Sequence, residues 1–154
     1  MQTGKIPEAL VSAMPQRVPA ASSENARATM RANKGKDTSP ELTVRRLLRQ
    51  AGHTGYRLQW PIRDDGGKLV TRVDVCFPGR KIAIFVHGCF WHRCPKCMLP
   101  LPKRNQEFWV AKFEDNVARD RLNEQKLRRM GWQVFTIWEC DSKDKNLRLI
   151  AEMM

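Results

Sequence analysis

The segment HGCFWHRCPKC, which begins at residue 87, holds the densest group of side chains that could do chemistry. Two residues separate its last two cysteines, and this spacing lets both thiolates face one metal ion. Four thiolates form a closed tetrahedral site, which favours structural over catalytic zinc. The alternative is a set of reduced, unliganded cysteines. Five candidate ligands compete for four places: Cys89, Cys94, Cys97, Cys140 and His92.

An acid and two histidines remain as candidates for catalysis. Asp74 lies on the polar face of one predicted strand, and His87 ends the next. Because adjacent strands lie about 4.8 Å apart, the two side chains can converge. A carboxylate at a strand end is a natural Mg²⁺ ligand, and an imidazole, from His87 or His92, can activate water at neutral pH. The alternatives are an ion pair of Asp74 with Arg72 or Arg63 and purely structural histidines.

Asp120 lies within the apolar stripe of a predicted helix, where an unpaired carboxylate would be costly. His87 is the expected partner, because this contact would fix the tautomer of the imidazole and raise its basicity. A pair with Arg119 or Arg121 is equally compatible with the sequence.

Two aromatic residues, Phe90 and Trp91, lie inside the cysteine-rich segment, and a third, Trp109, lies at the start of the predicted long helix. Rings in a loop usually pack into a local core. In a basic protein they can also stack on bases or wedge between them. The sequence favours neither interpretation.

The elements that must position these residues form an α/β pattern. Ser39 caps a helix that ends near residue 51, with Leu42, Leu47 and Leu48 on its apolar side. Strands are predicted at 56–62, 69–77, 81–86 and 133–138, a long helix at 106–130, and a last helix after residue 141. The third strand is nearly continuously apolar, as a buried central strand is, and the second places Val73, Val75 and Phe77 on one face and Arg72, Asp74 and Cys76 on the other. Cys76 is expected to be a small buried hydrophobe. The pattern predicts a mixed β-sheet flanked by helices.

Length and charge limit the function classes. The 154 residues suit one domain, at 27–154, preceded by a flexible tail at 1–26. Lys plus Arg is 28 and Asp plus Glu is 16, so the net charge of +12 favours a nucleic-acid partner. No long apolar run could span a membrane, and an odd number of cysteines without a signal peptide argues against a secreted disulfide framework, so a cytoplasmic protein is expected. A monomer is assumed by default.

Residues 27–38 have the composition of a DNA-contacting arm. The basic run includes Arg31 and holds one large apolar side chain, Met30. Such a run can lie on a phosphate backbone, and the alternative is a solvated linker.

Several motifs in order resemble the very short patch repair endonucleases. They are MRANKGKDTSPE at 30–41, FVHGCFWH at 85–92, EFW at 107–109, NVARDR at 116–121, GW at 131–132 and VFTIWEC at 134–140. The resemblance implies a restriction-endonuclease-like core and a nick 5′ to the thymine of a T:G mismatch, which starts repair of deaminated 5-methylcytosine. It also implies mismatch-repair proteins and a cognate cytosine-5 methyltransferase as partners, with the enzyme associated with the nucleoid.

The resemblance also implies roles for single residues. Asp74 and the backbone carbonyl of Val86, where the family often has threonine, correspond to the Mg²⁺ ligands. His92 corresponds to the general base, Glu41 to the acid that orients water, and His87 with Asp120 to a pair that assists phosphate chemistry. The expected zinc ligands are Cys89, Cys94, Cys97 and Cys140, and the expected DNA-contacting apolar residues are Met30, Phe90, Trp91 and Trp109. Two other functions stay open: a mismatch-independent nickase in restriction or phage defence, and a non-catalytic zinc module that binds DNA.

Overall fold

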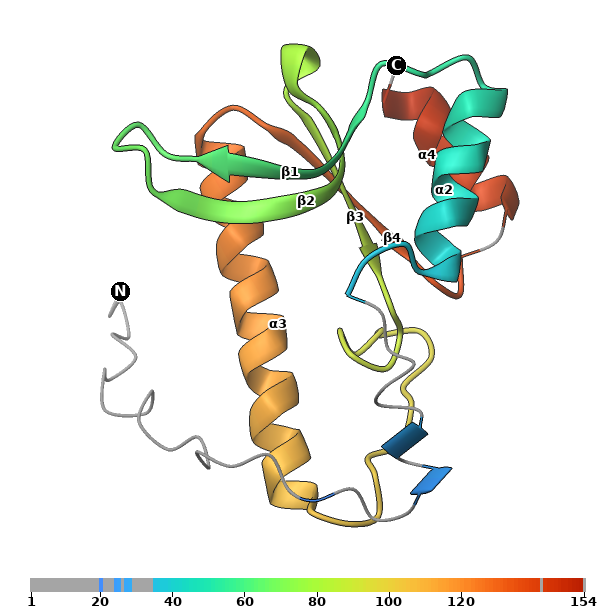
Figure 1. Ribbon diagram of the computed structural model, residues 1–154, viewed down its shortest axis with the longest axis vertical. Helices are drawn as coiled ribbons and strands as arrows, with labels where there is room; N and C mark the ends of the chain where they lie inside the picture. The colour runs from blue at the N-terminus through green and yellow to red at the C-terminus, as the bar shows by residue number, and fades with distance from the viewer. Residues whose placement is uncertain (1–19, 21–23, 26, 29–34, 142, 154) are drawn as a thin grey trace, which may run out of the picture.

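The fold is built on a four-stranded mixed sheet, seen in the computed structural model of Figure 1. The strands lie in sequence order, β1 (Arg57–Arg63), β2 (Leu69–Phe77), β3 (Ile82–His87) and β4 (Gln133–Trp138). β1, β2 and β3 pair antiparallel, and β3 pairs parallel with β4. The structure describes residues 20, 24–25, 27–28, 35–141 and 143–153, so Met30, Arg31 and most of the predicted tail lie outside the described residues.

Helices cover both faces of this sheet. Figure 1 shows α2 (Ser39–Gln50) and α4 (Lys143–Met153) side by side on one face, and α3 (Gln106–Arg129) along the other. The N-terminal half of α3 runs on past the sheet towards the cysteine-rich loop. A parallel β3–β4 pair needs such a crossover connection, and α3 supplies it. The predicted mixed sheet flanked by helices is confirmed.

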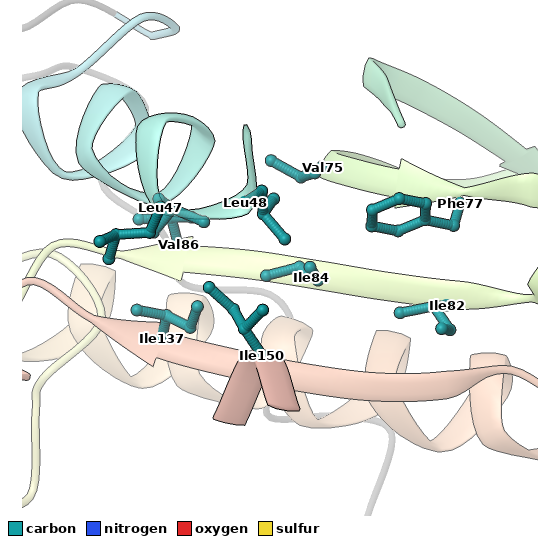
Figure 2. Packing of buried hydrophobic residues seen from close by; sticks show 10 residues of the cluster. Leu47, Leu48, Val75, Phe77, Ile82, Ile84, Val86, Ile137 and Ile150 are labelled. Carbon is teal, nitrogen blue, oxygen red and sulfur yellow. The ribbon is translucent and has the colours of Figure 1, made fainter. Parts of the chain in front are cut away.

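The larger core cluster fills the space between the sheet and the α2–α4 pair (Figure 2). Its fully buried members include Leu47 and Leu48 from α2, Ile84 from β3 and Ile150 from α4. Apolar strand residues on one face and an apolar helix stripe on the other bury each other here, which is the main source of fold stability. A second cluster, with Val73, Cys76, Ala83 and Leu127, lies under α3. The predictions of a buried Cys76 and a buried central strand β3 are confirmed.

Three local predictions are wrong. Thr38 is the N-cap residue of α2, and Ser39 is already helical. Leu42 is 49% exposed, because the buried side of the first turns of α2 falls on Glu41 and Val44. Val73 belongs to the cluster under α3, whereas Val75 and Phe77 belong to the opposite one, so β2 does not keep a strict period of two. Among the described residues, no helix is long and apolar enough to cross a membrane.

A buried and an exposed leucine of α2 give a matched test of this core. We expect Leu47→Ala to lower the free energy of unfolding by about 2–5 kcal/mol, because it leaves a cavity in the cluster. Leu42→Ala, on the exposed side, should change it by less than about 0.5 kcal/mol. Urea denaturation of both variants measures the difference, and equal losses would contradict the described packing.

Candidate active site

One open groove gathers all five predicted catalytic side chains. Its walls come from the start of α2, from β2, from the end of β3, from the loop that follows β3, and from α3. The predicted residues that line it are Glu41, Asp74, His87, His92 and Asp120. The chain thus brings together groups that lie up to 79 positions apart in the sequence (120 − 41).

Asp74 lies where β2 and β3 separate. The pairing of these strands ends at Val75 opposite Ile84. Beyond this point the backbone N–H of Val86 donates to Asp74 Oδ2 at 2.8 Å, so the carboxylate replaces the missing partner strand. Oδ1 accepts a hydrogen bond from Gln59 Nε2 at 3.2 Å. Burial raises the pKa of Asp74, the Val86 hydrogen bond opposes this shift, and the nearby charge of Glu41 adds to it.

His87 and His92 form a stacked pair beside Asp74. Their ring centroids are 3.9 Å apart and their planes differ by 7°. The stacking results from a turn in which the N–H of His92 donates to the carbonyl of Gly88 at 3.1 Å and returns the chain over the end of β3. The edge of Trp138 closes the other side of His87, with centroids 5.2 Å apart.

Asp120 pairs with His92, so the prediction that its hydrogen-bond partner is His87 is wrong. Asp120 Oδ2 lies 2.6 Å from His92 Nδ1. His87 still lies close: one ring nitrogen of His87, one of His92 and a carboxylate oxygen of Asp120 lie within 4.8 Å of one another. The turn of the loop places His92, and not His87, against α3.

The two imidazoles differ in their surroundings. His87 is 9% exposed, whereas the His92 side chain is 27% exposed. Burial, and to a smaller extent the neighbouring His92, lower the pKa of His87 to about 4, against the opposing charge of Asp120. His87 is therefore neutral at neutral pH and able to donate or accept a hydrogen bond without carrying charge.

Glu41 is buried at the first turn of α2, with 4% of its surface exposed. It accepts hydrogen bonds from Arg45 Nη2 at 3.1 Å and from the backbone N–H of Asp37 at 2.9 Å. Arg45 also donates to Asp37 Oδ1 at 2.6 Å. Sequence reasoning missed Arg45, although a Glu followed by an Arg four positions later on a helix is a known pairing signal.

The four predicted cysteine ligands converge between the loop after β3 and the end of β4. One Sγ atom from each of Cys89, Cys94, Cys97 and Cys140 lies within 4.8 Å of the others, and Cys94 and Cys140 are 3.6 Å apart. Four thiolates around one Zn²⁺ would be separated by about 3.8 Å, given Zn–S bonds of about 2.3 Å, so the cluster fits that ion. The His92 ring is occupied by Asp120 and stands outside the four-cysteine set.

The thiol of Cys94 has a lowered pKa, which favours metal binding. Burial raises the pKa of Cys94, but hydrogen bonds from the backbone N–H groups of Cys97 and Lys96 outweigh it and lower the pKa to about 7. A thiolate, the form that binds a metal, is thus accessible near neutral pH.

The predicted aromatic trio packs together at one side of the groove. Phe90 contacts Trp91 and Trp109 with centroids 5.1 and 6.0 Å apart, and Phe113 from α3 lies beneath at 5.1 Å from Phe90. All three trio members are partly exposed and line the groove. Asn116, which sequence reasoning missed, donates through Nδ2 to the carbonyl of Trp91 at 3.1 Å. The rings form a local core and also present surface to the groove.

Comparison with known proteins agrees with the resemblance. The family model described as DNA mismatch endonuclease Vsr matches residues 21–97. The chain belongs to the Vsr family. It is 38% identical to the type II nicking enzyme V.XorIIP of Xanthomonas oryzae pv. oryzae, over 80% of this chain and 85% of that protein. It is 38% identical to the type II nicking enzyme V.NaeI of Lentzea aerocolonigenes, over 81% and 74% respectively. It is 36% identical to the DNA mismatch endonuclease Vsr of Escherichia coli K12, over 72% and 67%.

The buried neutral state of His87 has a consequence for stability. The pKa of His87 is about 4 in the folded chain and 6.5 in the unfolded chain. As the pH falls between these two values, the unfolded chain binds a proton that the folded chain does not, and the free energy of unfolding decreases. Between pH 7 and pH 5 this group should remove about 2 kcal/mol from the free energy of unfolding. His87→Asn, which cannot titrate, should therefore gain about that much relative to the parent protein over this interval. Denaturant titrations at both pH values measure it, and parallel pH profiles would contradict a buried neutral His87.

Proposed function

We propose that this Vsr-family protein is a strand-specific DNA endonuclease that nicks 5′ to the thymine of a T:G mismatch and so starts removal of thymine formed by deamination of 5-methylcytosine. The observation that carries the proposal is the convergence of Asp74, Glu41, His87 and the His92–Asp120 pair in one groove, directly beside the aromatic trio. The separating strands β2 and β3, with an acid between them, are consistent with a restriction-endonuclease-like core.

Asp74 and the backbone carbonyl of Val86 would hold Mg²⁺. The donor set fits, because Mg²⁺ prefers carboxylate and carbonyl oxygens. The N–H of Val86 donates to Asp74, and in an extended strand the N–H and the carbonyl of one residue face the same side. The carbonyl of Val86 therefore faces the side of β3 on which Asp74 lies. The ion would polarise the scissile phosphate and neutralise developing charge.

His92 is the proposed general base. Its Nδ1 is engaged by Asp120, so Nδ1 carries a proton and Nε2 is left as the acceptor. Nε2 takes the proton of the attacking water, and the Asp120 carboxylate stabilises the imidazolium that forms. Glu41, held by Arg45, orients the water. Neutral His87 supports the His92 ring by stacking and offers a hydrogen bond to the phosphate.

The aromatic trio and the basic groove account for the substrate. Phe90, Trp91 and Trp109 present ring surface that can wedge into a duplex, which is easiest at a weakly stacked mismatch. Cationic side chains around the same groove would bind the phosphate backbone: Arg72, Arg93, Lys112, Arg119, Arg121 and Arg128. Structural zinc in the four-cysteine cluster would hold the loop that carries Phe90, Trp91 and His92.

One other function is favoured by a specific observation. Relatives at 38% identity are named type II nicking enzymes, which supports nicking of one DNA strand and makes the mismatch-independent nickase the second candidate. The aromatic trio beside the catalytic groups favours mismatch recognition, because rings enter the stack at least cost where a mismatch already weakens it. A non-catalytic zinc module would leave the His92–Asp120 pair and Asp74 without a purpose in the same groove.

End-labelled duplexes that differ only in T:G or C:G at one position test the proposal. We expect Mg²⁺-dependent nicking of the thymine strand at T:G alone, and a loss of at least about 100-fold in rate for His92→Ala and for Asp74→Ala, with DNA binding retained. His53→Ala removes the histidine that lies outside the groove and should nick at the parent rate. Equal nicking of both duplexes would establish the mismatch-independent nickase. Binding without any nicking, over a panel of flanking sequences, would overturn the endonuclease.

The cysteine cluster predicts about one zinc ion per chain. Elemental analysis of purified protein should show it, and Cys140→Ser or Cys97→Ser should lower both the zinc content and Tm. Cys76→Ala is the matched control, because Cys76 is buried in the core away from the cluster and its loss should leave the zinc content unchanged. Full zinc content in Cys140→Ser would exclude the four-thiolate site.

A further inference from the structure

Gln59 adopts an unusual backbone conformation in the middle of β1. Its φ is 48°, in the left-handed region that side chains other than glycine seldom occupy and that strands do not use. The residues on either side pair normally with β2, Leu58 with Val75 and Trp60 with Val73. The left-handed conformation therefore falls at the position of β1 that lies opposite Asp74.

The side chain of Gln59 uses this conformation to reach the acid. Gln59 Nε2 donates to Asp74 Oδ1 at 3.2 Å, while the N–H of Val86 donates to Oδ2 at 2.8 Å. Each carboxylate oxygen thus accepts one hydrogen bond: Oδ1 from Gln59 on β1 and Oδ2 from Val86 on β3. Two donors on opposite oxygens fix the rotation of the carboxylate plane and leave further lone pairs on each oxygen for a cation.

Strain of this kind persists where the surrounding structure gains something from it. Glycine would occupy the position without steric cost, but it would carry no donor. Glu41 lines the same groove, and its negative charge acts on Asp74. Without a hydrogen bond to hold it, the Asp74 carboxylate would turn away from that charge. The local strain of Gln59 is offset if its amide holds Asp74 against that repulsion.

We propose that Gln59 is a positioning residue that holds the Asp74 carboxylate in the orientation that binds the divalent cation. The inference rests on the proposed function, in which Asp74 carries Mg²⁺. The backbone carbonyl of Gln59 also accepts a weak hydrogen bond from Arg72 Nη1 at 3.4 Å, and a glycine would keep that contact. The side chain can therefore be removed without disturbing the backbone.

Gln59→Gly separates a positioning role from a structural role, because the two roles predict opposite changes in Tm. If Gln59 positions Asp74, glycine relieves the strain and keeps or raises Tm, while Mn²⁺ binding weakens by about tenfold, the usual size of an outer-sphere effect on a metal site. Mn²⁺ binding is measured by electron paramagnetic resonance on the zinc-loaded protein, free and with a T:G duplex. The Mg²⁺ concentration for half-maximal nicking should rise in parallel.

Two variants make the comparison matched. Lys81→Gly relieves the same left-handed conformation (φ 51°) at a position outside the groove, so it should leave Mn²⁺ affinity within about twofold of the parent. Gln59→Asn retains an amide in a residue that tolerates this conformation, but it is one methylene shorter and should bind Mn²⁺ as weakly as Gln59→Gly.

The outcomes distinguish the inference from the function beneath it. If Asp74→Ala binds Mn²⁺ as the parent does, Asp74 is not the metal ligand, and both proposals are overturned. If Asp74→Ala loses Mn²⁺ but Gln59→Gly and Gln59→Asn bind it normally, only the positioning role is overturned. If Gln59→Gly lowers Tm and leaves Mn²⁺ affinity unchanged, Gln59 supports the strand and not the site. Weaker Mn²⁺ binding with an unchanged or raised Tm establishes the positioning role.

Discussion

Antiparallel pairing between β2 and β3 stops at Val75 and Ile84, although both strands continue. A backbone N–H that loses its partner must find another, and for Val86 that partner is the Asp74 carboxylate. The same divergence opens the groove and leaves His87 at the end of β3 on its floor. β4 continues alongside β3 to Trp138, which packs against His87 and leads to Cys140 in the thiol cluster. The positions of Asp74, Val86 and His87 follow from this one interruption of the ladder.

The loop after β3 has few apolar contacts of its own and depends on its neighbours. The thiol cluster ties it to the end of β4, and the backbone N–H of Cys89 adds a hydrogen bond to Glu139 at 3.2 Å. α3 holds it from the other side. Asn116 and Asp120 are one helical turn apart and face the same way, and they bind the consecutive residues Trp91 and His92. These polar and thiol contacts act together with the packing of Phe90 and Trp91 against the rings of α3 to fix the loop.

Much of this arrangement could be predicted from the sequence, because periodicity and turn residues mark the elements and the chemistry is concentrated in one segment. The four strands, α2 and α3 lie within a residue or two of their predicted bounds, and the five candidate catalytic residues share one groove. The partner of Asp120 could not be predicted, because two histidines five positions apart are equivalent until the loop turns back on itself. Gln59 carries no sign in its residue type of a left-handed conformation. Leu42 looked internal because a helix pattern alone does not say where the sheet ends.

Trp91 and His92 are neighbours in the chain, and both are anchored to α3. In the proposed reaction, the ring that enters the duplex and the base that activates water are therefore held by the same helix. A duplex that does not admit the ring would keep its scissile phosphate away from a base that is already in position, so selectivity would be exerted on turnover more than on residence at the DNA. A substitution that shifts Trp91 on α3 would therefore also shift the neighbouring imidazole, and with it the rate of the proposed reaction.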